Sequence, residues 1–111
     1  MSEFRAITKF VRISPRKARL AAGLIRGLPV ISAQQQLEHS GLKGGRLLVK
    51  TLMSAVANAE LQSDTSAERL VVQEVRIDEG PRLKRAKPRS KGQRHPYIKR
   101  TSHFTVVVSA G

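Results

Sequence analysis

Side chains that could do chemistry are most concentrated in PRLKRAKPRSKGQRHPYIKR (81–100), near the C-terminus. This stretch has no acid and nine basic residues: Arg82, Lys84, Arg85, Lys87, Arg89, Lys91, Arg94, Lys99 and Arg100. Arginine binds phosphate through a planar fork of donors, and lysine supplies a compact point charge. Tyr97 adds an aromatic ring that can stack on a base. The composition therefore predicts binding to a surface dense in phosphate groups.

A second group of basic residues follows Ser14-Pro15, which is a helix-start signal because serine caps the first turn and proline fits the first helical position. Its members lie outside the expected apolar stripe of that helix: Arg16, Lys17, Arg19 and Arg26. A charged helix face is commonly only solvated, so that alternative stays open. Binding is favoured because no acid lies between Glu3 and Glu38 and because further basic residues precede the helix: Arg5, Lys9 and Arg12.

The sequence lacks the patterns of a catalytic, metal or cofactor site. Its histidines are far apart and follow no metal-ligand spacing: His39, His95 and His103. No cysteine is present, which excludes disulfides and thiolate metal sites. Glu38 and Glu60 have no evident acid–base partner, and no phosphate-binding glycine loop or nucleophile elbow occurs. We therefore predict no catalytic residue, no metal and no cofactor, and a protein that is not an enzyme.

Net charge narrows the class of partner. The 111 residues contain 21 Lys and Arg against 8 Asp and Glu, a formal charge of +13. Such an excess repels itself in a compact state, so the expected partner is a polyanion, with nucleic acid first and an anionic membrane surface second. No apolar run approaches the roughly 18–20 residues of a membrane span, and MSEFRAITKF lacks the apolar core of a signal peptide. We expect a soluble protein that works in the compartment where it is made.

Charge also divides the chain along its length. Residues 1–62 hold ten basic and three acidic residues, residues 63–79 hold two and five, and residues 80–111 hold nine and none. The length suffices for one domain but not for two with separate cores. We predict a single domain with a body (residues 1–80 and 101–111) and a basic arm (residues 81–100).

Apolar periodicity predicts the first elements of the body. A strand over 4–13 places three residues on one face: Ile7, Val11 and Ile13. Helices are predicted from Pro15 to a stop at Gly27 and Pro29, over about 30–38, and from Leu42 to about Leu61. The last of these has a wide apolar stripe. Gly44-Gly45 is expected only to weaken its first turn.

Two alternating segments, 70–80 and 101–109, predict an antiparallel pair of strands. The first places Val71, Val75 and Ile77 on one side, and the second places Phe104, Val106 and Val108 together. With the N-terminal strand they form a small three-stranded antiparallel sheet packed on three helices. The predicted fold class is α+β, with a long basic β-hairpin protruding from the body.

The connection between these strands is much longer than the roughly two to five residues of an ordinary hairpin loop. Pro88 and Pro96 stiffen it, and Ser90-Lys91-Gly92 suits a turn at its midpoint. If residues 82–97 run out and back, each limb of about eight residues reaches roughly 25 Å. An isolated two-stranded ribbon is marginal in water, so we expect it to be flexible when free and ordered when bound. A disordered basic linker stays open as the alternative.

Several segments together carry a resemblance to a known family: Ser14–Leu20 (SPRKARL), Ser54–Glu60 (SAVANAE), Asp78–Pro81 (DEGP), Lys84 through Arg89–Gly92 to Lys99–His103 (KRTSH), and Thr105–Ser109 (TVVVS). Each is weak alone, but together they are highly specific. Over almost its whole length the chain resembles bacterial large-subunit ribosomal protein twenty-two of the L series. Phe104 stands where the family has an aliphatic residue, a core difference without bearing on function.

The resemblance implies a structural constituent of the large ribosomal subunit that binds large-subunit (23S-type) rRNA, assists assembly and lines the nascent-peptide exit tunnel with its hairpin. The implied partners are this rRNA, neighbouring large-subunit proteins and the nascent polypeptide, with no membrane and no homo-oligomer, and the implied location is the cytoplasm, within the ribosome. The expected RNA-binding residues are Arg12, Arg16, Lys17, Arg19, Arg82, Lys84, Arg85, Lys87, Arg89, Lys91, Arg94, Tyr97, Lys99 and Arg100. The expected tunnel-lining tip is Pro88, Arg89, Ser90, Lys91, Gly92, Gln93 and Arg94.

Two other classes of function compete with this one. A basic DNA-compacting or anionic-membrane-binding protein would account for the charge, but not for a patterned α+β body around one long basic connection. A small hydrolase would need acid–base or nucleophilic residues that the sequence does not supply. RNA binding therefore remains the leading prediction.

Overall fold

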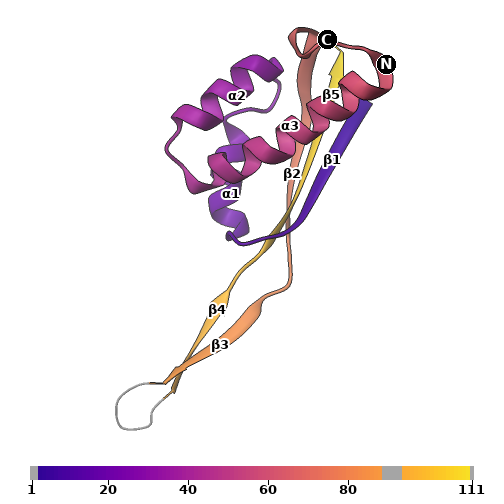
Figure 1. Ribbon diagram of the computed structural model, residues 1–111. Helices are drawn as coiled ribbons and strands as arrows, with labels where there is room; N and C mark the ends of the chain where they lie inside the picture. Colours follow the sequence, from indigo (N-terminus) through magenta and orange to yellow (C-terminus); the bar gives the residue numbers. More distant parts are fainter. Residues whose placement is uncertain (1–2, 89–93, 111) are drawn as a thin grey trace.

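The computed structural model describes the backbone of residues 3–88 and 94–110 (Figure 1). It describes the side chains of the same residues except those of 83–88 and 94–99. The body contains β1 (Glu3–Val11), α1 (Pro15–Gly23), α2 (Val30–His39), α3 (Lys43–Ser63), a 3-10 turn η1 (Ala67–Arg69), β2 (Leu70–Glu79) and β5 (Ser102–Ala110). The arm contains β3 (Leu83–Pro88) and β4 (Arg94–Lys99). Strands β1, β5 and β2 form an antiparallel sheet in that order, and the helices lie on one side of it. The predicted α+β fold is confirmed.

The arm is a separate two-stranded antiparallel sheet. Its register runs from Leu83 opposite Lys99 to Pro88 opposite Arg94. Figure 1 shows this ribbon leaving the end of the body at which β2 ends and β5 begins. The Cα trace extends 62 × 25 × 16 Å. Its radius of gyration is 16.9 Å, against about 13 Å expected for a compact chain of this length. The hairpin therefore makes the molecule long and narrow.

Helix α1 begins as its sequence predicts. The Ser14 hydroxyl accepts a hydrogen bond from the Lys17 backbone N–H, and Pro15 occupies the first helical turn. The helix ends at Gly23, earlier than the predicted stop at Gly27 and Pro29. A tight turn follows, with a hydrogen bond from Ile25 N–H to the Ala22 carbonyl, and it places the Ile25 side chain in the core.

The core lies between the central strand β5 and helix α3. Phe104, Val106 and Val108 on β5 are fully buried together, as their alternation predicts. They belong to the same core cluster as four fully buried residues of α3: Leu48, Leu52, Ala55 and Ala59. Thr51 of α3 is also buried, and its hydroxyl bonds that of Thr8 on β1 at 2.8 Å. The predicted stripe of α3 is confirmed.

Two bulges change the faces that strict alternation predicts. In β1, Phe4 and Ala6 are buried whereas Ile7 is 51% exposed, so grouping Ile7 with Val11 and Ile13 was wrong. The ladder to β5 shifts between Thr8 and Val11, which returns Val11 toward the core. An extra residue in one strand reverses the side to which every later side chain points.

The same effect occurs in β2. Its ladder shifts between Val72 and Glu74, so Val72 and Val75 are both buried although they are three positions apart, which in a regular strand would place them on opposite faces. Val71 was predicted to share a face with Val75 but lies on the other side, only half-buried. The prediction for Ile77 was correct.

The glycine pair at the start of α3 is a packing feature, which corrects the expectation that it only weakens the helix. A Cβ on Gly45 would lie 2.7 Å from the Leu37 carbonyl oxygen, and one on Gly44 would lie 3.3 Å from the Ala18 Cα. Both glycines are buried. They allow α3 to approach the backbones of α2 and α1 at distances that larger residues would prevent.

Candidate nucleic-acid interface

Basic side chains from two distant parts of the chain meet at the root of the arm. Arg16 and Lys17 in the first turn of α1 line a shallow open pocket together with Arg100, where β4 returns to the body. Ser14 and Leu20 complete its lining. All three basic residues are exposed. Among the ion pairs of the described side chains, none involves Arg16, Lys17 or Arg100. We call Arg16, Lys17 and Arg100 the root cluster.

The position of this cluster on α1 is electrostatically unfavourable without an anion. The N-terminus of a helix carries partial positive charge from its free N–H groups, and acidic residues normally occupy the first turn. The first turn of α1 has no acid and carries Arg16 and Lys17 instead. A phosphate placed there would meet both the helix N–H groups and the basic side chains.

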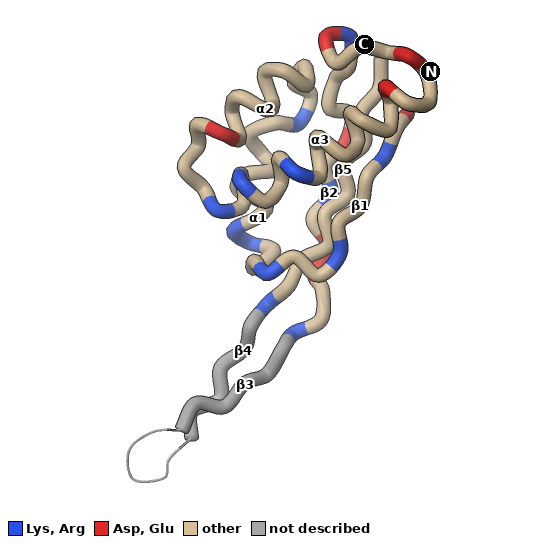
Figure 2. Tube along the Cα trace, in the orientation of Figure 1, with Lys and Arg blue, Asp and Glu red and all other residues tan. Residues whose placement is uncertain are grey.

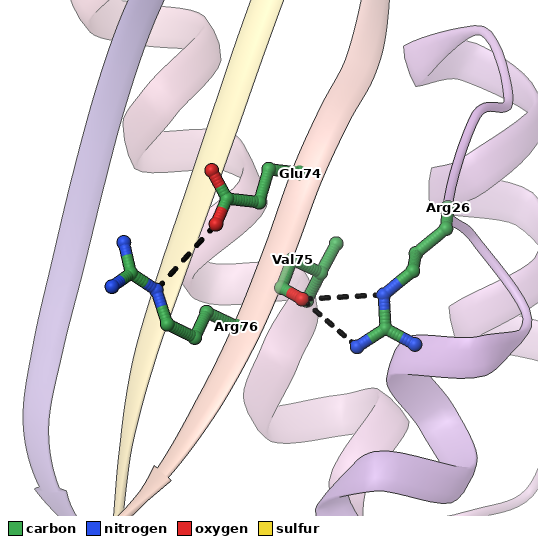
Figure 3. A network of polar contacts seen from close by, with 4 residues as sticks. All are labelled: Arg26, Glu74, Val75 and Arg76. Atoms are coloured by element: carbon green, nitrogen blue, oxygen red, sulfur yellow. Dashed lines mark hydrogen bonds and ion pairs between the residues drawn. The ribbon is translucent and has the colours of Figure 1, made fainter.

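Arg19 and Arg26, which the sequence grouped with Arg16 and Lys17, contact the edge of the sheet. Arg26 donates from Nε at 3.3 Å and from Nη2 at 2.9 Å to the Val75 carbonyl, as Figure 3 shows. Arg19 donates from Nη2 to the Ile77 carbonyl at 3.0 Å. The nearby Val72 exchanges backbone hydrogen bonds with Gly27 and Leu28. These contacts satisfy the outer edge of β2, which would otherwise stay unpaired.

The root of the arm is joined to the body by short hydrogen bonds. Gly80 N–H donates to the Thr101 carbonyl at 2.9 Å, and the Thr101 hydroxyl donates to the Pro81 carbonyl at 2.7 Å. Arg82 forms an ion pair with Glu79, with 2.8 Å between Nη2 and the carboxylate. Because both partners are about half-exposed, this pair is worth at most about 1 kcal/mol and leaves Arg82 available to a phosphate.

Charge is polarised along the molecule. Figure 2 shows basic positions around the root of the arm and acidic positions around the opposite end of the body, near the chain termini. Asp78 and Glu79, at the end of β2, are exceptions, and Glu79 is already paired with Arg82. Within residues 3–88 and 94–110, no three acidic or histidine side chains form a group that could hold a metal ion. No described helix is long and apolar enough to cross a membrane.

The predicted RNA-binding residues fall into three sets. The body and the arm root hold Arg12, which is exposed, together with Arg16, Lys17, Arg19, Arg82 and Arg100. A second set has a described backbone, paired in β3 and β4, but side chains that are not described: Lys84, Arg85, Lys87, Pro88, Arg94, Tyr97 and Lys99. The rest of the predicted tip lies wholly outside the described residues: Arg89, Ser90, Lys91, Gly92 and Gln93. Sequence reasoning missed Phe10 and His103, which contact each other beside the arm root.

Comparison with known proteins places the chain among the structural, non-enzymatic proteins of the ribosome. The model of the family "Ribosomal protein L22p/L17e" matches residues 6–109, and the chain belongs to this family. It is 70% identical over 109 residues to the large ribosomal subunit protein uL22 of Protochlamydia amoebophila, covering 98% of each chain. The same protein of Chlamydia abortus is 59% identical over 105 residues, with 95% of each chain covered. The chain is therefore a structural constituent of the large ribosomal subunit.

Proposed function

We propose that the chain binds large-subunit rRNA through the root cluster and the arm, and that this binding assists assembly of the subunit. The observation that carries the proposal is the convergence of Arg16, Lys17 and Arg100 at the N-terminus of α1, beside the arm root. Phosphates there would neutralise side chains that have no acidic partner among the described ion pairs. Because these residues come from both ends of the sequence, one RNA segment would tie α1 to the arm.

The arm extends this surface away from the body. Its nine basic residues and absence of acids make the hairpin complementary to RNA phosphates on both limbs. A two-stranded ribbon without a core of its own gains stability from such a surface. We propose that the arm runs into the subunit, that residues 88–94 line the nascent-peptide exit tunnel, and that the single-domain body contacts neighbouring large-subunit proteins.

The experiment that tests this function is a competition between polyanions. Labelled, deproteinised bacterial 23S rRNA is bound to the protein, and duplex DNA or anionic phospholipid vesicles are added at equal phosphate concentration. The rRNA should stay bound, because folded RNA offers loops and 2′-hydroxyl groups in addition to phosphates. Equal displacement by DNA would favour a DNA-compacting protein, and displacement by vesicles a membrane-binding one.

The different contacts of Arg16 and Arg26 predict different effects for two matched variants. Arg16→Ala should weaken rRNA binding by about 3- to 10-fold at moderate salt and leave stability unchanged, because Arg16 is exposed at the interface. Arg26→Ala should lower the free energy of unfolding by about 1–2 kcal/mol, because the Val75 carbonyl loses its donor. Its rRNA affinity should stay near that of the wild type. Filter binding and urea denaturation measure the two quantities, and similar profiles for both variants would contradict the assignment.

A further inference from the structure

An exposed aromatic ring lies where the body meets the arm. Phe10 is on the bulge of β1, and 62% of it is exposed to solvent. Its backbone φ is +59°, in the left-handed region that bulky residues rarely adopt. The conformation therefore costs free energy, and the side chain recovers little of it by burial. Strain of this kind persists where the surrounding structure imposes it, and it is concentrated at functional sites.

His103 on β5 fixes the position of this residue. The Phe10 backbone N–H donates to Nδ1 of His103 at 3.1 Å. The two rings are nearly perpendicular, at 89°, with centroids 5.1 Å apart. Because Nδ1 accepts, a neutral His103 ring carries its proton on Nε2. A perpendicular neighbour covers at most one face of the Phe10 ring, and 62% of the residue remains exposed to solvent.

The surroundings of Phe10 belong to the arm root and are mostly basic, with one acid, Asp78 of β2, opposite His103 in the sheet register. Lys9 and Arg12 flank it in sequence, both are exposed, and neither takes part in an ion pair of the described side chains. His103 lies beside Gly80, where a Cβ would come within 3.3 Å of the imidazole Cε1. Gly80 in turn bonds Thr101 at the start of the returning strand. An exposed ring accompanied by basic residues is the arrangement by which proteins bind unpaired nucleotides.

We propose that Phe10 stacks on an unpaired base of RNA at the root of the arm, with His103 as its positioning residue. This inference rests on the proposed rRNA binding and adds to it a contact that reads single-stranded RNA. Leu20 and Leu61 are exposed to a similar or greater extent, at 63% and 84%, but both lie on regular helices. Phe10 alone among these residues combines exposure with a left-handed backbone and a dedicated hydrogen bond.

The chain contains no tryptophan, which makes a direct optical test possible. In Phe10→Trp the new indole is the only one in the protein, and stacking on a base should quench its fluorescence when deproteinised 23S rRNA is added. A fully paired RNA duplex should bind through its phosphates without this quenching. Leu61→Trp, on the last turn of α3, is the matched control and should respond to neither. An unquenched Phe10→Trp at saturating rRNA would overturn the stacking proposal.

Affinity gives an independent readout. Phe10→Leu keeps an apolar side chain but removes the ring, and should weaken binding of the same rRNA by about 5- to 150-fold, the range expected for loss of one base–aromatic stack. Phe10→Trp should bind as tightly as the wild type. Equal affinities for Phe10→Leu and wild type would overturn the proposal. Loss of rRNA binding by the wild type itself would instead refute the proposed function.

The positioning role of His103 is tested in the Phe10→Trp background. His103→Ala removes the acceptor and should reduce the quenching at saturating rRNA, whereas His103→Asn offers a side-chain oxygen to the same N–H and should restore it. Equal quenching in both double variants would show that His103 does not position the ring at residue 10. If the indole responds in assembled subunits but not to naked rRNA, the ring contacts a protein, and base stacking is excluded.

Discussion

Raising the salt concentration from about 50 to about 200 mM is expected to weaken rRNA binding by about 10³- to 10⁵-fold. The reason is that each phosphate neutralised by a lysine or arginine releases condensed counterions, and this release loses its entropic advantage as salt rises. The chain offers enough cations for about 6–10 such contacts, since the arm alone holds nine basic residues. Filter binding or fluorescence anisotropy across a salt series measures the slope of log affinity against log salt.

Matched variants make the salt slope interpretable. Arg16→Ala should reduce its magnitude by about one unit, because one phosphate contact is lost. Arg76→Ala removes a charge that is paired with Glu74 on the open side of the sheet, at 3.5 Å, and should leave the slope unchanged. A nearly flat salt response of the wild type would show that phosphate neutralisation does not drive binding.

Shortening the arm should remove most of the affinity without unfolding the body. Leu83 and Lys99 are opposite each other at the base of the ribbon, so residues 84–98 can be replaced by an Asn-Gly turn that joins them. The arm is a separate sheet, and among the side chains that the structure describes the buried core lies in the body. We expect a melting temperature within a few degrees of the wild type and an rRNA affinity lower by on the order of 100-fold or more.

A charge-neutral arm separates charge from shape in this experiment. Replacing the basic residues between 84 and 98 by glutamine keeps the length of the arm, and the affinity should fall to nearly the level of the shortened form.

In assembled subunits, a photo-crosslinker placed at residue 91 should reach a stalled nascent chain in the full-length protein. Absence of the crosslink would contradict the proposal that residues 88–94 line the tunnel. For the shortened protein, unfolding of the body would show that the arm is part of the core.

Period-two and helical patterns predicted the elements and most of the core. Phe104, Val106 and Val108 form one buried face because the extra residues of the two bulges lie in β1 and β2, so β5 keeps its period of two. Ser14 caps α1 because a local hydrogen bond between residues three apart needs no tertiary information. Such features are determined within a few residues, which is why the sequence alone identifies them.

Faces beyond a bulge could not be predicted in this way. Alternation placed Ile7 and Val71 on the same faces as later residues of their strands, but the extra residues near Phe10 and Gln73 reverse the faces of β1 and β2. A bulge is stabilised by its partners, here the His103 ring that accepts the Phe10 N–H. Since His103 is ninety-three positions away, no local pattern contains this information.

The sequence also did not show which basic residues contact the sheet and which remain free to bind a phosphate. Arg16, Lys17, Arg19 and Arg26 follow one another on a short stretch and differ in no obvious sequence property. In the fold, Arg19 and Arg26 reach the carbonyls of β2, whereas Arg16 and Lys17 point to the arm root. The position of each residue relative to the edge of β2, on α1 or in the turn that follows it, decides which is structural.

Composition by itself predicted a polyanionic partner and a basic arm distinct from the body, because net charge and acid-free runs do not depend on folding. The tertiary structure decided which basic side chains remain free to bind a phosphate and which aromatic ring is exposed near them. Those properties arise from contacts between segments far apart in the chain: α1 against β2, Arg100 beside Arg16, and Phe10 against His103.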